Sequence, residues 1–328
     1  MTYTIEKVTT LIGARRYGDN DTNIGFILTD SRSLCFPEET LFFALKSERN
    51  DGHNYIPELY RRGVKNFVVT DVPKGYASDY PEANFLKVVN TLEALQRLAE
   101  RHRDEFNIPI VGITGSNGKT MVKEWLYQLL SPSMFVTRSP RSYNSQIGVP
   151  LSVWLMNEQT QVGVFEAGIS QPGEMLALRD IIQPTIAVLT NVGSAHQENF
   201  SSLEEKCREK LILFHDAETV VYDGDDEVIT KVVAEYPDYK GEKLFWSLQN
   251  PEAPFYVKKI EKQQSVSVIT YIYKGVEDSF SIPFIDDASI QNSIICAAVA
   301  SKIGLSAEDI DKRMALLEPV AMRLEVKV

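Results

Sequence analysis

The 328-residue chain carries 34 lysine and arginine residues against 45 aspartate and glutamate residues, a net charge of −11, and 44% of its residues are hydrophobic. This composition is typical of a globular protein of two or three domains, and the negative charge argues against a general nucleic-acid or anionic-membrane binder. No run of about 18 apolar residues occurs, so no membrane insertion is expected. Three widely spaced cysteines, Cys35, Cys207 and Cys296, and a start without an apolar signal core predict a cytoplasmic protein with reduced thiols and no zinc site.

Residues 1–90 form the first predicted domain, a small α/β unit. Its apolar stretches predict four short strands, at residues 25–30, 40–46, 66–71 and 85–90. Residues 54–63 predict a helix between two of these strands. Residues 91–107 predict a charged helix with leucines on one side, which we interpret as a connector to the next domain.

Residues 108–318 form the second predicted domain, in which strand and helix patterns alternate. Such alternation implies a parallel sheet with helices on both faces. Residues 254–284 add an antiparallel meander, and two helices follow it. Residues 319–328 resemble the start of a further strand, which we interpret as the beginning of a third domain. The predicted fold class is therefore α/β, with a small α/β domain followed by a mostly parallel-sheet domain.

The segment VGITGSNGKT, residues 111–120, is the most informative motif. It follows an apolar strand and precedes a helix with apolar residues at helical spacing, so its glycines can direct backbone N–H groups at an anion beside a helix N-terminus. We expect a P-loop that binds phosphate groups, with Lys119 on the outer phosphates and Thr120 on Mg²⁺. The strict pattern requires glycine at position 113, where this chain has Ile113. The alternative is a glycine-rich turn that only caps the helix.

Glu166, Asn191 and His196 follow predicted strands of the same sheet. Because the carboxyl ends of parallel strands meet at one edge, we expect these side chains near the P-loop. A carboxylate and an imidazole beside Thr120 suit Mg²⁺ or Mn²⁺. The alternative for Glu166 is a cap or surface charge, and for His196 a structural role.

The helix at residues 201–214 places a lysine among apolar residues. Leu203, Cys207, Lys210 and Phe214 lie on one face, which predicts a buried stripe. A buried, unpaired ammonium group is unfavourable. Lys210 therefore either extends to the surface or pairs with a carboxylate, or its neutral amine has reacted with CO₂ to give a carbamate that supplies two oxygens to a metal.

The segments VGITGSNGKT, VFEAGIS, NVGSAH and the lysine-bearing helix occur in an order that resembles the Mur ligases, ATP-dependent amide-forming enzymes of peptidoglycan precursor synthesis. Residues 29–69 are similar to the UDP-sugar-binding domain of that family. The segments YNSQIGVPLSVW and EPVAMRLEVK are most similar to the member that adds D-alanyl-D-alanine to UDP-N-acetylmuramoyl-tripeptide.

The resemblance implies roles for individual residues. Catalysis would involve Lys119, Glu166, His196 and Lys210, and the metal ligands would be Thr120, Glu166, His196 and Lys210, the last as a carbamate. ATP would be held by Gly115, Ser116, Asn117, Gly118, Lys119 and Thr120. Asn292 would face adenine, and Arg323 would approach the nucleotide. The substrate contacts would be Ser31, Arg32, Lys46, Asp51, Gly52 and His53 at the UDP-sugar end and Asn144 near the phosphates. Two departures occur: Ala288 and Ser289 stand where relatives often carry His-Asn, and Ala167-Gly168-Ile169-Ser170 stands where many relatives continue with Gly-Ala-Asn.

The implied reaction has two steps. The terminal carboxylate of the substrate attacks the ATP γ-phosphate, and the amine of D-alanyl-D-alanine then displaces phosphate from the acyl phosphate. Because the family carries a third domain, we expect this chain to bind substrates without completing catalysis. The alternatives are another Mur ligase or a folylpolyglutamate-synthase-like ligase, a P-loop kinase or NTPase, and a non-catalytic nucleotide-sugar-binding module.

Overall fold

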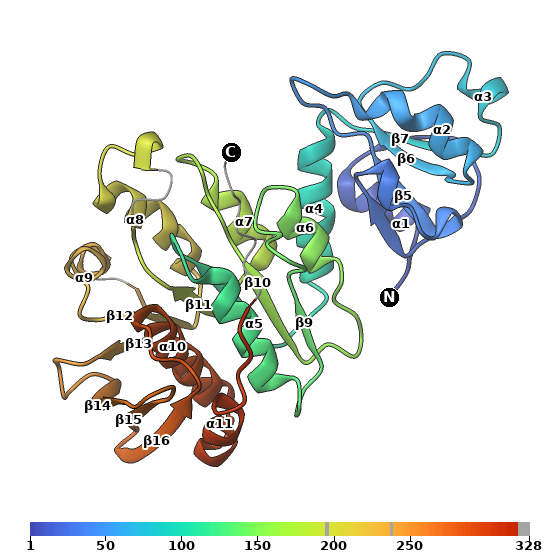
Figure 1. The fold of residues 1–328 in the computed structure, drawn as a ribbon. Helices are drawn as coiled ribbons and strands as arrows, with labels where there is room; N and C mark the ends of the chain where they lie inside the picture. The colour runs from blue at the N-terminus through green and yellow to red at the C-terminus, as the bar shows by residue number, and fades with distance from the viewer. Residues whose placement is uncertain (194–196, 237–238, 321–328) are drawn as a thin grey trace. The chain divides into compact units, whose positions relative to one another are not determined.

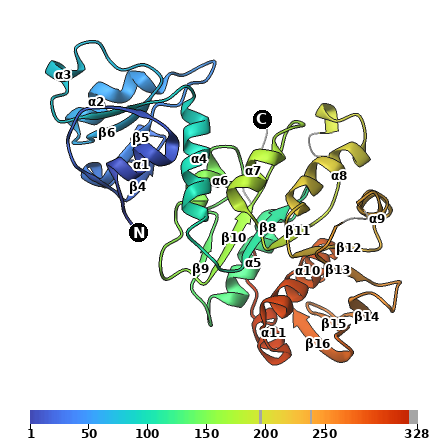
Figure 2. The same ribbon diagram turned by 180° about the vertical axis from the view of Figure 1, so that it is seen from behind.

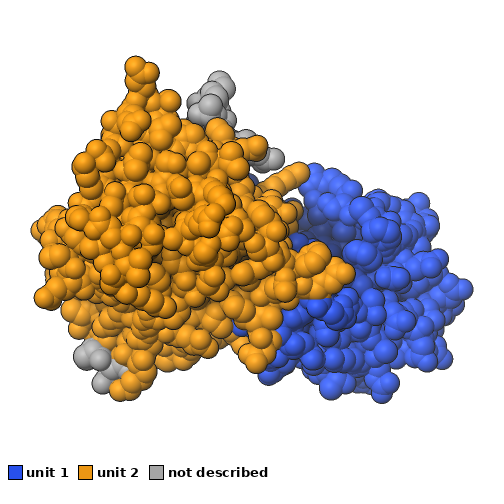
Figure 3. Space-filling model, turned by 90° about the horizontal axis from the view of Figure 1, so that it is seen from below, with its two compact units in different colours: residues 1–106, 153–158 blue, residues 107–152, 159–328 orange. Residues whose placement is uncertain are grey.

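The structure is a computed structural model that describes residues 1–193, 197–236 and 239–320. The chain divides into two compact units, coloured separately in Figure 3. Unit 1 comprises residues 1–106 together with residues 153–158, and unit 2 comprises residues 107–152 and 159–328. Among the described residues, no helix combines the length and apolar character needed to cross a membrane.

Unit 1 is built on a five-stranded sheet with the strand order β2-β7-β6-β5-β4. Figure 1 labels its strands β5, β6 and β7. The strands are β2 (Arg15–Tyr17), β4 (Phe26–Leu28), β5 (Thr40–Phe43), β6 (Asn66–Val69) and β7 (Asn84–Lys87). Strands β4 to β7 pair in parallel and correspond to the four strands expected from the sequence, while β2 pairs antiparallel with β7. Two further short strands, β1 (Tyr3–Thr4) and β3 (Asn23–Ile24), pair with each other.

Helices cover both faces of this sheet because its strands are apolar on both sides. The helices are α1 (Ile5–Ile12), α2 (Ile56–Arg61), α3 (Tyr76–Asp79) and α4 (Thr91–Arg103). On one face α1 packs against α4, and Val8 and Leu95 share a core with Leu41 of β5. On the other face Ile56 of α2 packs with Phe42. Helix α4, which the sequence suggested as a connector, is thus part of unit 1.

Residues 153–158 join unit 1 although they lie almost 50 residues beyond its other part. Trp154 donates a hydrogen bond from its indole N–H to the carbonyl oxygen of Gly25 (3.0 Å). Its ring contacts Tyr3 and His102, with centroid distances of 5.3 and 4.7 Å. This distant segment therefore completes the core of the first unit.

Unit 2 contains a nine-stranded sheet with the order β16-β15-β14-β13-β12-β11-β8-β10-β9. Its strands are β8 (Ile110–Thr114), β9 (Val136–Arg138), β10 (Val162–Glu166), β11 (Ile186–Leu189), β12 (Thr219–Asp223), β13 (Glu242–Ser247), β14 (Phe255–Lys262), β15 (Ser267–Tyr273) and β16 (Val276–Ile282). All neighbours from β9 to β14 are parallel, and β14, β15 and β16 form the expected antiparallel meander.

Helices lie on both faces of the large sheet (Figure 1, Figure 2). They are α5 (Lys119–Leu130), α6 (Gly148–Val153), α7 (Met175–Ile182), α8 (Leu203–Leu211), α9 (Glu227–Ala234), α10 (Asp287–Ile303) and α11 (Ala307–Met314). Helices α5, α10 and α11 share one core with Val111 and Ile113 of β8. The alternate residue Gly112 faces the other way, where an added methyl group would stand 3.0 Å from Pro184. Gly112 lies one position before the place where the strict P-loop pattern requires glycine. Its lack of a side chain allows Pro184 to pack closely against this face of the sheet.

The strand order of unit 2 indicates at which edge of its sheet a ligand would bind. Strand β8 is central, and the chain adds β10 on one side of it and β11 on the other. Ligands of such sheets bind beyond the carboxyl ends of the strands, where the order reverses. Glu166 ends β10, and Thr190 follows β11, so both lie at the edge from which the P-loop leaves β8.

Candidate functional site

The P-loop joins β8 to α5 and depends on two glycines. Gly115 and Gly118 have φ angles of +146° and +82°, and Gly118 is the N-cap of α5 without any capping side chain. A methyl group at Gly115 would lie 1.9 Å from Oγ1 of Thr190, and one at Gly118 would lie 2.6 Å from Oδ1 of Asn292. Both the backbone conformation and the close packing therefore require glycine, and the uncapped helix N-terminus favours an anion.

Residues that follow β11 brace this loop. The side-chain amide of Asn191 accepts a hydrogen bond from the backbone N–H of Asn117 (3.1 Å) and donates one to its carbonyl oxygen (3.2 Å). The hydroxyl of Thr190 also donates to that carbonyl oxygen (2.5 Å), and Ser116 exchanges hydrogen bonds with the backbone of Gly193. These contacts hold the loop in its conformation. The sequence predicts that Asn191 lies near the P-loop, but it does not predict the contact with Asn117.

Lys119 and Thr120 begin α5 and lie at the centre of the site. The ammonium group of Lys119 donates to the carbonyl oxygen of Gly115 (2.8 Å), and burial lowers its pKa although Glu166 opposes that shift. The hydroxyl of Thr120 donates to Oε2 of Glu166 (3.1 Å) and lies 3.3 Å from Oγ of Ser142. The structure therefore brings together the lysine, the hydroxyl and the carboxylate that the sequence predicted.

Glu166 is completely buried, and Lys123 neutralises its charge. The ammonium group of Lys123 lies 3.1 Å from Oε1 of Glu166 and 3.0 Å from Oε1 of Glu124, and it donates to the carbonyl oxygen of Arg141. Lys123 itself is 0% exposed. The sequence does not single out Lys123, because a lysine one turn into a helix is usually solvent-exposed.

The turn between β9 and α6 completes the wall beside Glu166. The backbone N–H of Glu166 donates to Oγ of the buried Ser139 (3.1 Å). Asn144 accepts a hydrogen bond at its carbonyl oxygen from the N–H of Gly168 (2.8 Å), and a methyl group on Gly168 would stand 2.8 Å from the amide carbon of Asn144. Gly168, one of the departures from the family pattern, thus leaves space for Asn144.

Helix α8 contributes two buried lysines, Lys206 and Lys210, each 2% exposed. Burial, followed by the charges of Lys119 and Lys206, lowers the pKa of Lys210 to about 7. Lys206 donates to the carbonyl oxygen of Gly193 (2.6 Å). The predicted buried stripe is confirmed at Cys207, Lys210 and Phe214, whereas Leu203 is only half-buried. The burial of Lys206 was not expected.

The residues present fit phosphate and a hard divalent cation. The P-loop offers backbone N–H groups, a helix N-terminus and Lys119, while Thr120 and Glu166 offer oxygen ligands of the kind that Mg²⁺ prefers. Oε1 of Glu166 is buried and has no hydrogen-bond donor aligned with it. Within the described part of the chain, no three His, Cys, Asp or Glu side chains gather to hold a metal by themselves. His196 and Arg323, two of the predicted contacts, lie outside the described residues.

Asn292 begins the second turn of α10 and packs against the P-loop. It is 6% exposed, and its amide nitrogen lies 3.2 Å from Sδ of Met121. The remaining departures, Ala288 and Ser289, occupy the first turn of the same helix, where the N–H of Ser289 donates to the capping carboxylate of Asp286 (2.8 Å).

Unit 1 holds the second predicted cluster. Gly52 packs so closely that an added methyl group would lie 2.7 Å from the carbonyl carbon of Ala44. Nδ1 of His53 lies 2.6 Å from Oδ1 of Asp51, and Nε2 accepts a hydrogen bond from the backbone N–H of Thr70 (3.1 Å). Nδ1 therefore carries the proton and donates to Asp51. The backbone N–H and ring of His53 hold the pKa of Asp51 below its usual value.

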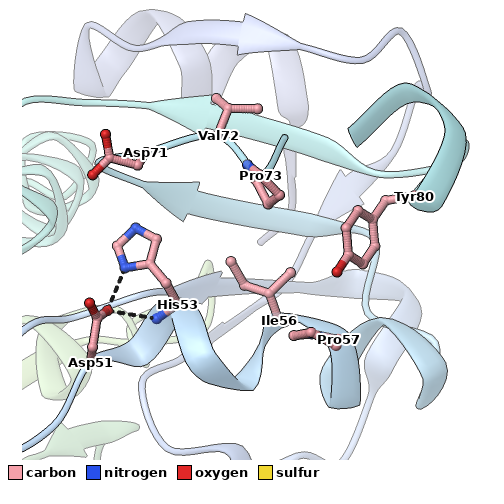
Figure 4. Close-up of a pocket in the computed structure, with 8 residues that line it drawn as sticks. All are labelled: Asp51, His53, Ile56, Pro57, Asp71, Val72, Pro73 and Tyr80. Atoms are coloured by element: carbon pink, nitrogen blue, oxygen red, sulfur yellow. Dashed lines mark hydrogen bonds and ion pairs between the residues drawn. The ribbon is translucent and has the colours of Figure 1, made fainter. Parts of the chain in front are cut away.

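A pocket of about 350 Å³ borders this cluster (Figure 4). It is lined by Asp51, His53, Ile56, Pro57, Asp71, Val72, Pro73 and Tyr80. Figure 4 shows the His53 ring and Asp51 at one end and Tyr80 at the other. Lys46 lies 3.6 Å from Oδ2 of Asp51.

Ser31 and Arg32 lie in a short 3-10 helix after β4. The buried Ser31 accepts a hydrogen bond at its carbonyl oxygen from Arg62 (2.8 Å). The Arg32 side chain is 88% exposed and pairs with Asp30 at 2.7 Å. The cation at this place is therefore accessible to a ligand.

Comparisons with known proteins agree with this geometry. The family profile described as Mur ligase middle domain matches residues 113–300, and the profile described as Mur ligase family, catalytic domain, matches residues 23–103. The UDP-N-acetylmuramoyl-tripeptide--D-alanyl-D-alanine ligase of Bacillus subtilis (strain 168) is 29% identical over 312 residues, which cover 93% of this chain and 64% of that relative. The chain thus spans just under two thirds of the length of this relative.

Solved structures show the same fold. The crystal structure of MurF from Acinetobacter baumannii matches with a TM-score of 0.88 at 24% identity, over 99% of this chain and 70% of that one. MurF ligase from Thermotoga maritima, in complex with ADP, matches with a TM-score of 0.77 at 26% identity, over 90% of this chain and 66% of that one. The α/β fold with mostly parallel sheets is therefore confirmed.

Proposed function

The chain belongs to the Mur ligase family, and from this we propose that it acts as an ATP-dependent amide ligase, adding D-alanyl-D-alanine to UDP-N-acetylmuramoyl-tripeptide in peptidoglycan precursor synthesis. The observation that carries the proposal is the joint geometry of Lys119, Thr120 and Glu166 at the end of the central strands. A relative that carries this activity by name is similar over 93% of the chain.

The chemistry that we propose begins with activation of a carboxylate. A carboxylate acylates an amine poorly, because oxide is a poor leaving group. Transfer of the ATP γ-phosphoryl group to the terminal carboxylate of the tripeptide forms an acyl phosphate. The amine of D-alanyl-D-alanine then attacks the acyl carbon, and phosphate leaves.

The contribution of the protein is positioning and charge stabilisation. The P-loop amides would bind the phosphates, and Lys119 would move from the carbonyl oxygen of Gly115 to the outer phosphates. Charge that develops on the transferring group would be stabilised by this ammonium. Asn292 would face the adenine, and Asn144 would approach the phosphates of the substrate.

A divalent cation, Mg²⁺ or Mn²⁺, would be held by Thr120, Glu166, His196 and Lys210, and when bound it supplies a Lewis acid that neutralises phosphate charge. Thr120 and Glu166 are already in contact (3.1 Å).

For Lys210 we propose a carbamate. Only a neutral amine reacts with CO₂, and burial holds the pKa of Lys210 at about 7, so an appreciable fraction is neutral at physiological pH. A protein equilibrated with ¹³CO₂ should show a carbamate carbon resonance that a Lys210→Met variant lacks. Absence of that resonance in the unmodified chain removes the carbamate from the proposal.

In unit 1 we propose the UDP end of the substrate. Arg32 and Lys46 offer accessible cations, and Asp51 and His53 border the pocket. We also propose a cytoplasmic location, where ATP and nucleotide-linked precursors are available. The described free thiols agree with a reducing compartment. No nucleic-acid partner is proposed for a chain with a net charge of −11.

The test is a thermal-shift titration with Mg-ATP, then with UDP-N-acetylmuramoyl-tripeptide, its dipeptide precursor and UDP alone. A ligand at 100 times its dissociation constant stabilises a protein by about 2.7 kcal/mol. The tripeptide nucleotide should give a larger shift than the precursor and UDP at equal concentration. A response to ATP without a response to any UDP compound would instead favour a P-loop kinase or NTPase.

A further inference from the structure

Building on the proposed function, we propose that Lys123 makes the metal site depend on nucleotide: its buried ammonium group neutralises Glu166, so the protein alone takes up no divalent cation and the ion binds only together with ATP. Lys123 is then a positioning residue, which acts through Glu166 and need not touch the substrate.

The contacts of Lys123 fix the position of its side chain. Its side chain is 0% exposed, and its ammonium group faces Oε1 of Glu166, Oε1 of Glu124 and the carbonyl oxygen of Arg141. Glu166 interacts with this ammonium group as an ion pair, although no N–H group is aligned with its Oε1 for a hydrogen bond. Arg141 adopts a φ of +48°, and this turn of the chain presents its carbonyl to Lys123. Lys123 thus ties the end of β10 and the turn after β9 to α5.

The charges of Lys123, Arg138, Glu124 and Glu166 already balance, and Lys119 adds a further cation near Glu166. Oε2 of Glu124 pairs with Nε of Arg138 at 3.0 Å, so two carboxylates face two cations. A dication that joins Thr120 and Glu166 would leave an excess of positive charge beside a buried ammonium group. Because Coulomb interactions are strong where water is excluded, this repulsion opposes binding of the bare ion. The negative charge of ATP removes that excess.

The number of oxygen ligands leads to the same conclusion. Mg²⁺ demands near-octahedral coordination and is usually bound through one or two carboxylates, waters and substrate phosphates. Glu166 is the carboxylate beside Thr120, and the described residues include no cluster of three His, Cys, Asp or Glu side chains that could act as a cage. Even with His196 and a carbamate at Lys210, the protein would supply fewer than the six ligands of an octahedral ion, so phosphate oxygens of ATP are expected to join waters in completing the site.

The experiment measures Mn²⁺ uptake by the electron paramagnetic resonance signal of the free ion, with and without a non-hydrolysable ATP analogue. The wild-type chain should take up Mn²⁺ only with the analogue. Lys123→Met should bind Mn²⁺ without nucleotide at least tenfold more tightly than wild type, whereas Lys123→Arg, which keeps the charge, should not. Lys231→Met is the matched control, since it removes an exposed lysine from an ion pair with Glu204 (3.2 Å) and should behave as wild type.

Stability gives a second readout in case Lys123→Met folds poorly. Removal of one partner leaves the other charge buried and unpaired, which is strongly destabilising. Because Mn²⁺ can take the place of the ammonium group beside Glu166, the ion should raise the melting temperature of Lys123→Met more than that of wild type. Adding Glu166→Gln to this variant should abolish the difference.

Two results would overturn the inference. One is nucleotide-free uptake by wild type as tight as uptake with the analogue, and the other is no gain in uptake or in melting temperature for Lys123→Met. Either result leaves the proposed ligase function standing, provided that wild type still takes up Mn²⁺ in the presence of the analogue. Failure of wild type to bind Mn²⁺ even with the analogue would instead contradict the proposed metal and nucleotide site.

Discussion

Substitution of Gly118 by alanine tests whether the P-loop geometry is required for ATP binding. With a φ of +82°, Gly118 occupies the left-handed region, which costs an L-residue about 1–2 kcal/mol. The new methyl group would also lie 2.6 Å from Oδ1 and 3.3 Å from Cγ of Asn292. Such an overlap in a packed site costs about 1–3 kcal/mol more, and the loop or Asn292 has to move.

Gly173 provides a matched control in the same unit. Its φ is +85°, and a methyl group added there would have no neighbour within 4 Å. Gly173→Ala therefore carries the conformational cost without the overlap. We expect Gly118→Ala to weaken Mg-ATP binding at least tenfold, about 1.4 kcal/mol, while Gly173→Ala leaves the dissociation constant unchanged.

Isothermal titration with Mg-ATP, combined with melting curves, measures both effects. The double variant Gly118→Ala/Asn292→Ala separates them, because shortening Asn292 relieves the overlap but not the backbone strain. The double-mutant cycle formed by this variant, the two single variants and the wild type should show an interaction energy between positions 118 and 292 of about 1 kcal/mol or more. Equal ATP affinity in Gly118→Ala and Gly173→Ala, or strict additivity in the cycle, would refute the role assigned to this contact.

Three further substitutions address other parts of the chain. Asn191→Ala removes two hydrogen bonds to Asn117 and should weaken Mg-ATP binding by about 1–2 kcal/mol, with no change in affinity for UDP compounds. An unchanged affinity for ATP in calorimetry would contradict the role of Asn191 in holding the P-loop. Gly52→Ala overlaps the backbone of Ala44 and should lower the melting temperature and weaken UDP binding, with ATP binding in unit 2 as the internal control. Burial lowers the pKa of His102 to about 4, against 6.5 in the unfolded chain. Because the unfolded chain therefore binds the proton first, the free energy of unfolding should fall by up to about 3 kcal/mol as the pH drops from 6.5 to 4. Urea unfolding of His102→Gln should show a flatter dependence over that pH range, and an equally steep one would contradict the assignment.

The elements that the sequence predicted are those with a local pattern. The P-loop could be placed from β8, the glycines and the apolar face of α5, because all three lie within 25 consecutive residues. The antiparallel meander was predicted for the same reason, from neighbouring apolar stretches. The buried position of Lys210 followed from its helical spacing relative to Cys207, and the structure confirms it.

The features that the sequence missed depend on contacts between distant segments. Lys123 becomes buried because Glu166, 43 positions along the chain, ends the strand beside α5. Neither residue alone signals the pair, since a lysine or glutamate in a helix or strand is usually exposed. Strand β13 was also missed, because its position depends on pairing with β12 and β14 in the sheet rather than on a local sequence pattern.

Unit 1 is formed by two separate stretches of the chain, which has consequences for the evolution of the gene and for the design of fragments. Trp154 reaches the core of this unit from a stretch that the chain visits only after it has begun the second unit. A single recombination point therefore cannot transfer unit 1 whole to another protein, and the two units are expected to be inherited together. A fragment that ends at residue 106 would expose the site where Trp154 meets Tyr3 and His102, so residues 153–158 must be supplied through a designed linker.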